Sequence, residues 1–576
     1  MNKTIKFLFF SLLLIILSSF TPQKTKKHEG KVVVYIYATN DVHGHFFDST
    51  YNGSVNESSM SKVSGFINKS RLNLGEQSVI LLDIGDNLQG DNSVFYYNNI
   101  DTLSKNLVSE AFNFIKYDAV VVGNHDIEAG HRVYDKVKRE LKAPYLAANA
   151  VSTTTGCPYF QPYTIINKNG VKIAVIGFTN ANIKRWLSSE LYEGIDFLEI
   201  FPLIEKYIAD IRRKESPDLV VAAMHAGLGK ENYYQLEDPS KYIAAHVKGI
   251  DLIFAAHDHN TFAGFIKNEQ DSVPVVEGGS KAQNLSLASV EMEFKRGKVV
   301  NKKITVSVIP LKDFKSDSVY NRYFSERFNN VKKFSNSVIG YIDKGFSSRD
   351  AFFGSSEYVD MIHSIQLENF KADISFAAPL SFDITINAGP VSFQSLTNIY
   401  PFENQLYVIK LSGKEIKNYL EYSYRLWVNK VFSPKYPMLN IYTDENGVTR
   451  FKNMHFNFDS AAGIIYKVDV TKGYGERINI ISMTDGTPFN LEKVYEVALS
   501  SYRASGGGDL LTLGAGIPTE QLNERVVMRM GDIRDMIYAK LKKEGKISPA
   551  KLNNWKFVPD SIVKERIIIE RAKLFE

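Results

Sequence analysis

Short, continuous apolar runs that end abruptly in polar residues recur through the first half of the chain. One is YDAVVVGNHD, residues 117–126; others are KVVVYIYATND, SVILLDIGDN, VKIAVIGFTN, DLVVAAMHAG and DLIFAAHDHN. Runs of this kind, bounded by Gly, Asn and Asp, are typical of strands buried on both faces. Longer helix-compatible segments separate them as far as about Ser307. The pattern therefore predicts an α/β fold, a β-sandwich flanked by helices, over residues 30–312.

A chain of 576 residues is long enough for several domains. The charged, amphipathic stretch 313–337 predicts a linker helix, because its apolar residues recur at helical spacing. A second α/β domain is predicted over 338–525, followed by a closing helix and a tail over 526–576 that packs back on it.

The N-terminus is typical of a secretory signal peptide, which we place at residues 1–22. Lys3 and Lys6 precede an apolar core from Phe7 to Leu17. An uncleaved membrane anchor is the alternative, but this core is shorter than the roughly 20 residues that span a bilayer. We expect an exported protein, periplasmic or extracellular, that is free of the membrane after cleavage. Its single cysteine, Cys157, cannot form an internal disulfide, so the fold depends on its hydrophobic cores.

The charge of the chain argues against a polymeric partner. The formal net charge is only +5, and no cluster of Lys and Arg forms a basic stripe. DNA and RNA are therefore unfavourable as partners. We expect a monomer that acts on a small molecule.

Five of the predicted strands end in residue types that bind metals. These residues are Asp41 and His43, Asp86, Asn124, His225, and His257 with His259. In α/β proteins, ligands gather outside the carboxyl ends of strands. The residues are therefore expected to converge.

Taken singly, each of these residues has an ordinary structural interpretation. His225 alone is more often a satisfied, partly buried histidine, and Asp86 alone would be read as a turn residue. Recurrence at one topological position favours a site, and clustered carboxylates such as Asp41 and Asp86 are unfavourable without cations. Five other histidines are interpreted as structural or surface residues: His45, His131, His246, His363 and His455.

The mixture of Asp, His and Asn indicates a dinuclear centre for Zn, Mn, Fe or Co, rather than Ca or a cysteine-based structural zinc. Two such ions, roughly 3.5–4 Å apart, can clamp a phosphoryl group and generate hydroxide near neutral pH.

In this order, DVHGH, GDN, GNHD, a later His and HDH resemble the signature of the calcineurin-like metallophosphoesterase superfamily. The resemblance implies that Asp41, His43 and His259 hold one divalent metal. It implies that Asn124, His225 and His257 hold the other, with Asp86 bridging. His125 would be the unligated imidazole that donates to the phosphoryl or leaving oxygen, and Glu128 would orient it. The closest 5'-nucleotidases have Asp where this chain has Glu128.

Two stretches of the second domain extend the resemblance. YPFENQL contains Phe402 and Asn404, and SSYRASGGGD contains Tyr502 followed by three glycines. In the secreted 5'-nucleotidases and 2',3'-cyclic-nucleotide 2'-phosphodiesterase/3'-nucleotidases, matching aromatics sandwich the base, which stabilises it by about 1–3 kcal/mol per ring. The resemblance implies a base-edge hydrogen bond from Asn404 and close backbone approach at Gly507. The alternative is that Phe402 and Tyr502 are core residues.

YRASGGG and NNWKF look more like the cyclic-nucleotide branch. The 5'-nucleotidases have a Gly-Gly-Ile-Arg-like run, and its equivalent here, SFAAPLSFD, has no arginine. The favoured function is a secreted, dinuclear-metal 2',3'-cyclic-nucleotide 2'-phosphodiesterase/3'-nucleotidase. The alternatives are a 5'-nucleotidase, a phosphatase for another small compound such as a sugar phosphate, and a nucleotide-binding protein with an inactive site.

Overall fold

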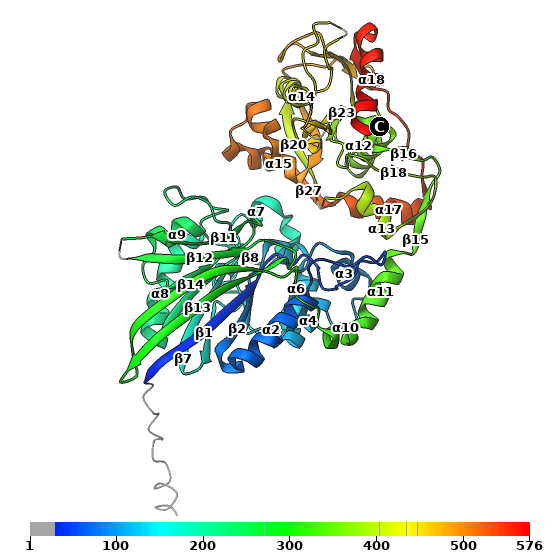
Figure 1. Cartoon of the computed structure of the whole chain (residues 1–576). Helices are drawn as coiled ribbons and strands as arrows, with labels where there is room; N and C mark the ends of the chain where they lie inside the picture. The colour runs from blue at the N-terminus through cyan, green and yellow to red at the C-terminus, as the bar shows by residue number, and fades with distance from the viewer. Residues whose placement is uncertain (1–28, 270, 403, 434, 446) are drawn as a thin grey trace, which may run out of the picture.

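The computed structural model describes residues 29–576 except 270, 403, 434 and 446, so the predicted signal peptide lies outside the described residues. Two domains lie one above the other and are joined along one side through α11 (Ser325–Ser335) and β15 (Val338–Ile342) (Figure 1).

The first domain is a sandwich of two six-stranded sheets. The first sheet has the order β14 (Lys298–Pro310), β13 (Asn284–Lys295), β1 (Gly30–Thr39), β2 (Val79–Asp83), β3 (Ala119–Val121) and β4 (Tyr145–Leu146). The second has the order β11 (Thr261–Lys267), β12 (Ser272–Gly278), β10 (Leu252–Phe254), β9 (Leu219–Met224), β7 (Val171–Phe178) and β6 (Tyr163–Lys168).

Each central strand of the sandwich is buried on both faces, which explains the continuous apolar runs. One face contributes to a core between the sheets, where Ile36 and Leu82 meet Ile173 and Val221. The outer face of the first sheet packs against α2 (Met60–Leu74), α4 (Leu107–Ile115) and α6 (His131–Glu140). The outer face of the second packs against α8 (Ile200–Glu215) and α9 (Ser240–His246). The predicted helix-flanked sandwich is confirmed.

The segment between the domains forms two helices rather than the single linker helix predicted. Helix α10 (Ser318–Tyr323) begins where Asp317 accepts from the Val319 N–H, and α11 follows after Phe324. The Phe324 ring is buried in the core of the first domain, against the ring of Tyr320. The chain turns at Phe324 to bury this ring, so the helical pattern is interrupted there.

The second domain has a five-stranded sheet of order β23 (Ser460–Ala462), β17 (Ile374–Ala377), β26 (Val494–Ser500), β20 (Gln405–Ser412) and β27 (Val526–Asp532). Helices α12 (Glu357–Asn369), α14 (Gly413–Trp427) and α17 (Ile533–Glu544) pack around it. Residues 526–576 are part of this domain, because β27 pairs with β20 and β29 (Trp555–Val558) pairs with β24 (Ile464–Asp469). The chain ends in α18 (Asp560–Phe575).

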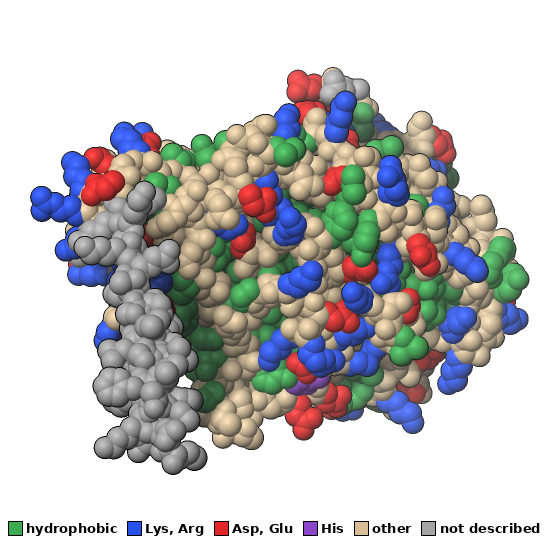
Figure 2. Space-filling view, turned by 90° about the horizontal axis from the view of Figure 1, so that it is seen from below, with side chains coloured by type: hydrophobic (Ala, Val, Ile, Leu, Met, Phe, Trp, Pro, Cys, Tyr) green, Lys and Arg blue, Asp and Glu red, His purple; other side chains and the backbone are tan. Residues whose placement is uncertain are grey.

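The surface carries both signs of charge. Figure 2 shows Lys and Arg side chains interspersed with Asp and Glu side chains on the face it presents. Among residues 29–576, with the four gaps given above, no helix combines the length and apolarity that crossing a bilayer requires.

Candidate metal centre and aromatic pocket

The sandwich brings the five polar strand ends together. Strands β1, β2 and β3 are parallel neighbours in one sheet, and β9 and β10 are parallel neighbours in the other. Their carboxyl ends therefore open on one edge of the sandwich. Two groups made up of predicted ligands form there, each with all its ligand atoms within 4.8 Å of one another: Asp41, His43 and His259, and Asp86, His225 and His257. A third group joins His257 to Glu237 and Asp238.

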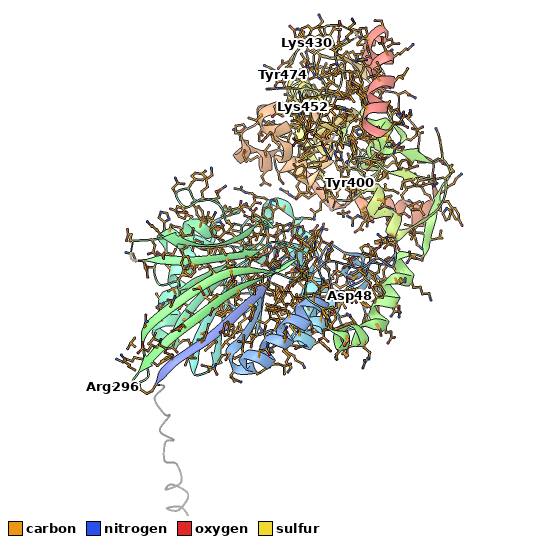
Figure 3. The ribbon with its side chains drawn as sticks, in the orientation of Figure 1. Asp48, Arg296, Tyr400, Lys430, Lys452 and Tyr474 are labelled. Atoms are coloured by element: carbon orange, nitrogen blue, oxygen red, sulfur yellow. The ribbon has the colours of Figure 1, made fainter. Side chains whose placement is uncertain are left out.

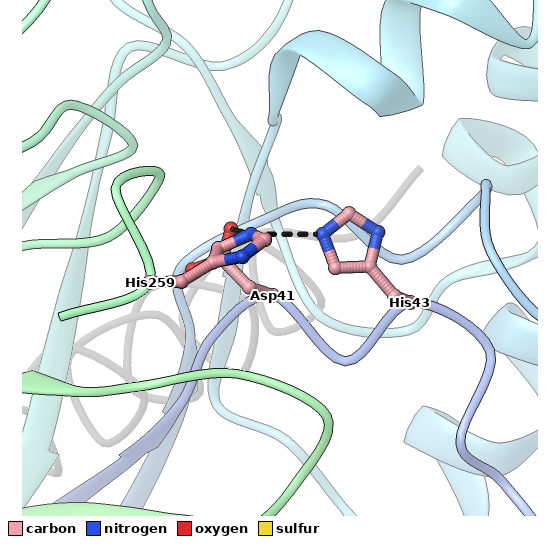
Figure 4. A group of neighbouring side chains, drawn as sticks. All are labelled: Asp41, His43 and His259. Atoms are coloured by element: carbon pink, nitrogen blue, oxygen red, sulfur yellow. Dashed lines mark hydrogen bonds and ion pairs between the residues drawn. The ribbon is translucent and has the colours of Figure 1, made fainter. Parts of the chain in front are cut away.

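In the first group, two imidazoles and a carboxylate point toward one another (Figure 4). The Nε2 atoms of His43 and His259 are 3.2 Å apart, and His259 Nε2 is 3.5 Å from Asp41 Oδ1. Asp41 Oδ2 accepts from the backbone N–H of His257 at 3.1 Å. Asp41 Oδ1 is buried and has no hydrogen-bond partner. A buried carboxylate oxygen left in this way, beside two ring nitrogens, suits a cation.

The second group is built around Asn124 and Asp86. Asn124 Oδ1 lies 3.1 Å from His225 Nε2 and 2.9 Å from His257 Nδ1. Asp86 Oδ2 is 3.1 Å from the same nitrogen of His225, and Asp86 Oδ1 accepts from the His125 N–H at 2.8 Å. Carboxylate, amide and imidazole ligand atoms thus meet at one place.

The outer nitrogens of three rings have partners that set the tautomer. His43 Nδ1 lies 3.2 Å from the Gln89 carbonyl oxygen, and His225 Nδ1 lies 2.7 Å from that of Ile84. His257 Nε2 lies 3.1 Å from Glu237 Oε1. Each outer nitrogen can donate its N–H to the oxygen, so the nitrogen that faces the cluster has the lone pair a metal requires.

The backbone at the cluster has an unusual conformation. Five of the seven predicted ligands have a positive φ: Asp41 (48°), His43 (46°), Asp86 (62°), His257 (88°) and His259 (58°). Such strain in residues other than glycine gathers at functional sites. Close packing at the cluster also requires glycine at position 123, since a Cβ there would lie 2.0 Å from Asp86 Oδ1.

The electrostatics also favour a cation. Burial lowers the pKa of His43 to about 4, which keeps this ring neutral and able to bind a metal. Burial also opposes charge on His225, but Asp86 beside it raises its pKa to about 9. Burial alone would raise the pKa of Asp86, yet the charges of His225 and His125 hold it well below its usual value. A proton on His225 thus neutralises Asp86 in the metal-free protein, and a divalent ion can take its place. The residues fit a metal.

His125 and Glu128 form a pair beside the cluster. Both belong to α5 (Asn124–Glu128), and His125 Nδ1 lies 2.5 Å from Glu128 Oε2. The His125 ring packs edge-on to His43, with centroids 5.4 Å apart. Glu128 Oε1 accepts from Gln405 Nε2 at 2.6 Å, so the second domain contacts this pair directly. The longer glutamate therefore still reaches the imidazole.

Two family models cover the two domains. Residues 34–261 match the model described as calcineurin-like phosphoesterase, and residues 338–514 match that of the 5'-nucleotidase C-terminal domain. Residues 34–261 thus form a calcineurin-like phosphoesterase domain. The phosphoesterase is thus a phosphoric ester hydrolase of a class that uses divalent metals.

Named relatives extend over most of the phosphoesterase. A 2',3'-cyclic-nucleotide 2'-phosphodiesterase/3'-nucleotidase from Haemophilus influenzae is 24% identical over 92% of this chain and 88% of its own. A 5'-nucleotidase from Vibrio cholerae is 25% identical over 67% of this chain and 74% of its own. The solved structure of NAD nucleotidase from Haemophilus influenzae has the same fold, with a TM-score of 0.59 and 18% identity over 92% of this chain and 99% of its own. The first two relatives support hydrolysis of nucleotides, and the third shows the fold.

The second domain of the phosphoesterase has a pocket of about 310 Å³, lined by Phe402, Asn404 and Tyr502 among others. The residues Phe402 and Tyr502 are 41% and 43% exposed, so they are not core aromatics. The Phe456 ring lies edge-on to both, at 5.7 Å and 6.4 Å between centroids. Another lining residue, Tyr400, lies on the side of this domain that faces the first, as Figure 3 shows.

Gly507, where backbone approach to a ligand is predicted, lies beside the Tyr502 ring. It is not among the residues that line the pocket; a Cβ there would lie 2.4 Å from the Tyr502 ring. Glycine at 507 therefore leaves room for the ring. Arg503, next in the chain after Tyr502, fixes the wall of the pocket: its guanidinium donates to Asp459, Asn457 and the carbonyl oxygens of Phe456 and Gly507.

Sequence reasoning missed Asp126, although it lies within the GNHD motif. This buried carboxylate accepts from the backbone N–H groups of Gly123, Asn87 and Leu88 at 2.8, 2.8 and 3.0 Å. It therefore ties the loop of Asp86 to the loop of Asn124. The motif was the available signal, since an acidic residue at this helical position can satisfy exposed backbone donors.

Proposed function

We propose that this phosphoesterase hydrolyses 2',3'-cyclic nucleotides to 3'-nucleotides, and then 3'-nucleotides to nucleosides, after export from the cytoplasm. The observation that carries the proposal is the adjacency of two residues at the start of β20. Asn404 lines the aromatic pocket, and the next residue, Gln405, contacts Glu128 beside the metal-ligand cluster. A molecule with an aromatic base at one end and a phosphoryl group at the other matches such a site.

Asp41, His43 and His259 would hold one divalent ion, and Asn124, His225 and His257 would hold the second, with Asp86 shared. Zn, Mn, Co and Fe all suit these ligands. The ions would polarise the phosphoryl oxygens and activate water near neutral pH.

The protein side chains have separate tasks. His125 gives a proton to the leaving ribose oxygen, O2' of the cyclic ester or O3' of the monoester. Glu128 accepts from His125 Nδ1, which keeps Nε2 as the nitrogen that carries the transferred proton. Phe402 and Tyr502 hold the base by stacking, which is tolerant of base identity. Asn404 adds a hydrogen bond to a base edge.

Two observations favour the cyclic and 3'-nucleotides over 5'-nucleotides. The relative from Haemophilus influenzae with the cyclic-nucleotide name aligns over 92% of this chain, against 67% for the Vibrio cholerae 5'-nucleotidase. Among the described residues that line the aromatic pocket, the one arginine is Arg503. All five of its N–H donors are used by protein oxygens. The stretch SFAAPLSFD, equivalent to the arginine-bearing run of the 5'-nucleotidases, offers no arginine in its place.

A 5'-nucleotidase is the second candidate. The Vibrio cholerae relative and the family of the C-terminal domain support it. In this case a nucleoside 5'-monophosphate would bind with its base in the aromatic pocket and its phosphate at the metal centre.

The deciding experiment is a panel of adenosine 2',3'-cyclic phosphate, adenosine 3'-phosphate, adenosine 5'-phosphate and glucose 6-phosphate with purified protein loaded with Mn, Co or Zn. We expect the highest kcat/KM for the cyclic and 3'-substrates, with no turnover after chelation. Preference for the 5'-phosphate would establish the second candidate, and preference for the sugar phosphate would overturn the nucleotide assignment. No chelator-sensitive release from any substrate would indicate an inactive, binding-only site.

Export rests on the sequence of residues 1–22. Expression of the full chain in a Gram-negative host, followed by N-terminal sequencing of periplasmic protein, tests it. A mature chain that starts shortly after residue 22 is expected; an intact N-terminus held in the membrane would support the anchor instead.

A further inference from the structure

One carboxylate group connects the two domains at the candidate site. Glu128 Oε2 lies 2.5 Å from His125 Nδ1, and Glu128 Oε1 accepts from Gln405 Nε2 at 2.6 Å. His125 and Glu128 belong to the first domain and Gln405 to the second, 277 residues further along the chain. One oxygen of the Glu128 carboxylate is therefore bound by the His125 imidazole and the other by the Gln405 side-chain amide.

Gln405 is itself held rigidly. It is the first residue of β20, is only 7% exposed, and is paired with Asp532 of β27. Its backbone N–H donates to Ser501 Oγ at 3.1 Å, beside Tyr502 of the aromatic pocket. A side chain placed by a sheet fixes its partner more tightly than one on a loop. Through Gln405, the position of the Glu128 carboxylate therefore depends on the position of the second domain.

The length of Glu128 suits this shared role. An aspartate at 128 would withdraw the carboxylate by roughly 1.5 Å, the length of one C–C bond. With the helix α5 and strand β20 in place, the shorter side chain could not keep both contacts. The extra methylene that distinguishes Glu128 thus gives the pair a partner in the other domain.

We propose that Gln405 is a positioning residue for the His125–Glu128 pair, so that hydrolysis in the first domain depends on the second domain being seated against it. The inference rests on the proposed role of His125 in phosphoester hydrolysis. Gln405 fixes the plane of the Glu128 carboxylate, and the carboxylate in turn fixes the ring of His125. Misplacement of a reacting group by about 1 Å can lower a rate 100-fold.

The chain offers a matched control at the same domain boundary. Asn92 Nδ2, in α3 (Asn92–Phe95), donates to Gln394 Oε1 of α13 (Phe393–Ile399) at 2.9 Å. This is another hydrogen bond between the domains that involves a glutamine amide, and the further hydrogen bonds of Asn92 and Gln394 go to Ser335 and Thr397. Gln394→Ala therefore removes one domain contact without touching the pair.

The test compares Gln405→Met with Gln394→Ala, using glycerol 2-phosphate, a substrate that has no base but whose leaving alkoxide oxygen needs a proton, as the ribose oxygen does. Gln405→Met keeps the length of the side chain but cannot donate. We expect kcat to fall about 10- to 100-fold with KM changed less than about threefold and metal content unchanged. Gln394→Ala should stay within about twofold of the parent. A kcat for Gln405→Met equal to that of Gln394→Ala would overturn the proposal.

A second readout does not depend on activity. In zinc-loaded protein labelled with ¹⁵N-histidine, the His125 Nδ1 shift reports its hydrogen bond, and a His125→Gln sample assigns the signal. The shift should move in Gln405→Met and remain in Gln394→Ala. An unmoved shift in Gln405→Met overturns the positioning role whatever the activity. If the parent protein hydrolyses no phosphoester, the proposed function fails while this shift still decides the role of Gln405.

Discussion

The Nε2 atoms of His43 and His259 lie 3.2 Å apart, although the two residues are separated by 216 positions in the chain. Their strands belong to different sheets, so the sandwich itself brings the rings together. Both residues have a positive φ, and the buried Asp41 Oδ1 lies 3.5 Å from the His259 nitrogen. The fold thus holds strained residues with their ligand atoms close together before any ion binds, an arrangement that a cation would stabilise.

Removal of Asp86 should empty the metal centre. Asp86→Ala deletes the carboxylate that lies 3.1 Å from His225 Nε2 and that is shared by the two proposed ions. We expect loss of both metals and of nearly all hydrolysis, measured by elemental analysis of the purified protein and by nucleotide turnover. Retention of two metal equivalents would contradict the shared role.

His125→Ala should have the opposite signature, because His125 is proposed to transfer a proton rather than bind metal. We expect an unchanged metal content with kcat lower by about 100- to 10,000-fold, the usual contribution of general acid–base catalysis. The control is His131→Ala, since His131 pairs with Asp135 away from the cluster. A metal-free His125→Ala protein would refute this division of roles.

Glu237 should tune metal affinity without binding the ions of the main cluster. Its Oε1 accepts from His257 Nε2 at 3.1 Å, which orients the ring that faces Asn124. Loss of such an outer partner weakens metal binding by about 10- to 100-fold. Glu237→Ala, titrated against a competing chelator, should show this loss. Affinity equal to that of the parent would indicate that the backbone alone fixes His257.

The strand ends were predictable because a strand buried on both faces leaves a continuous apolar run and a sharp polar boundary. Asp41, Asn124 and His225 could therefore be found from sequence. The contact of Glu128 with Gln405 could not, since it depends on how two domains dock, and no local pattern encodes that. The break at Phe324 was hidden for a related reason: burial of one ring interrupts a helix whose spacing is otherwise regular. The position of Gly507 against the Tyr502 ring could not be predicted either, because no sequence pattern shows which ring a glycine lies beside.

Tyr502 should matter only for substrates with a base. Its ring is 43% exposed and lines the aromatic pocket, so Tyr502→Ala removes stacking of about 1–3 kcal/mol. We expect kcat/KM for adenosine 3'-phosphate to fall about 5- to 100-fold and that for p-nitrophenyl phosphate to stay unchanged. Tyr474→Ala is the control, because Tyr474 is 47% exposed and lies toward the far end of the domain (Figure 3). Equal losses on both substrates would count against stacking.

His363 should make the second domain less stable in acid. It is fully buried in α12, with Nδ1 2.8 Å from Ser375 Oγ and Nε2 3.1 Å from Ser460 Oγ. Burial lowers its pKa to about 3, whereas an unfolded histidine titrates near 6.5. Between these values only the unfolded chain binds the proton, so the stabilisation is complete above about pH 6.5 and is lost as the pH falls toward 3. At pH 5 the loss is about 2 kcal/mol.

His363→Asn should therefore flatten the pH dependence of the unfolding free energy between pH 4 and 6, even if the smaller side chain lowers stability at every pH. Urea unfolding of the full chain, followed by fluorescence, measures this, because Trp427 and Trp555 are buried in the second domain. Ile365→Val in the same helix is the control: it removes buried volume but no titrating group, so its slope should match the parent. An unchanged slope in His363→Asn would show that His363 does not couple folding to pH.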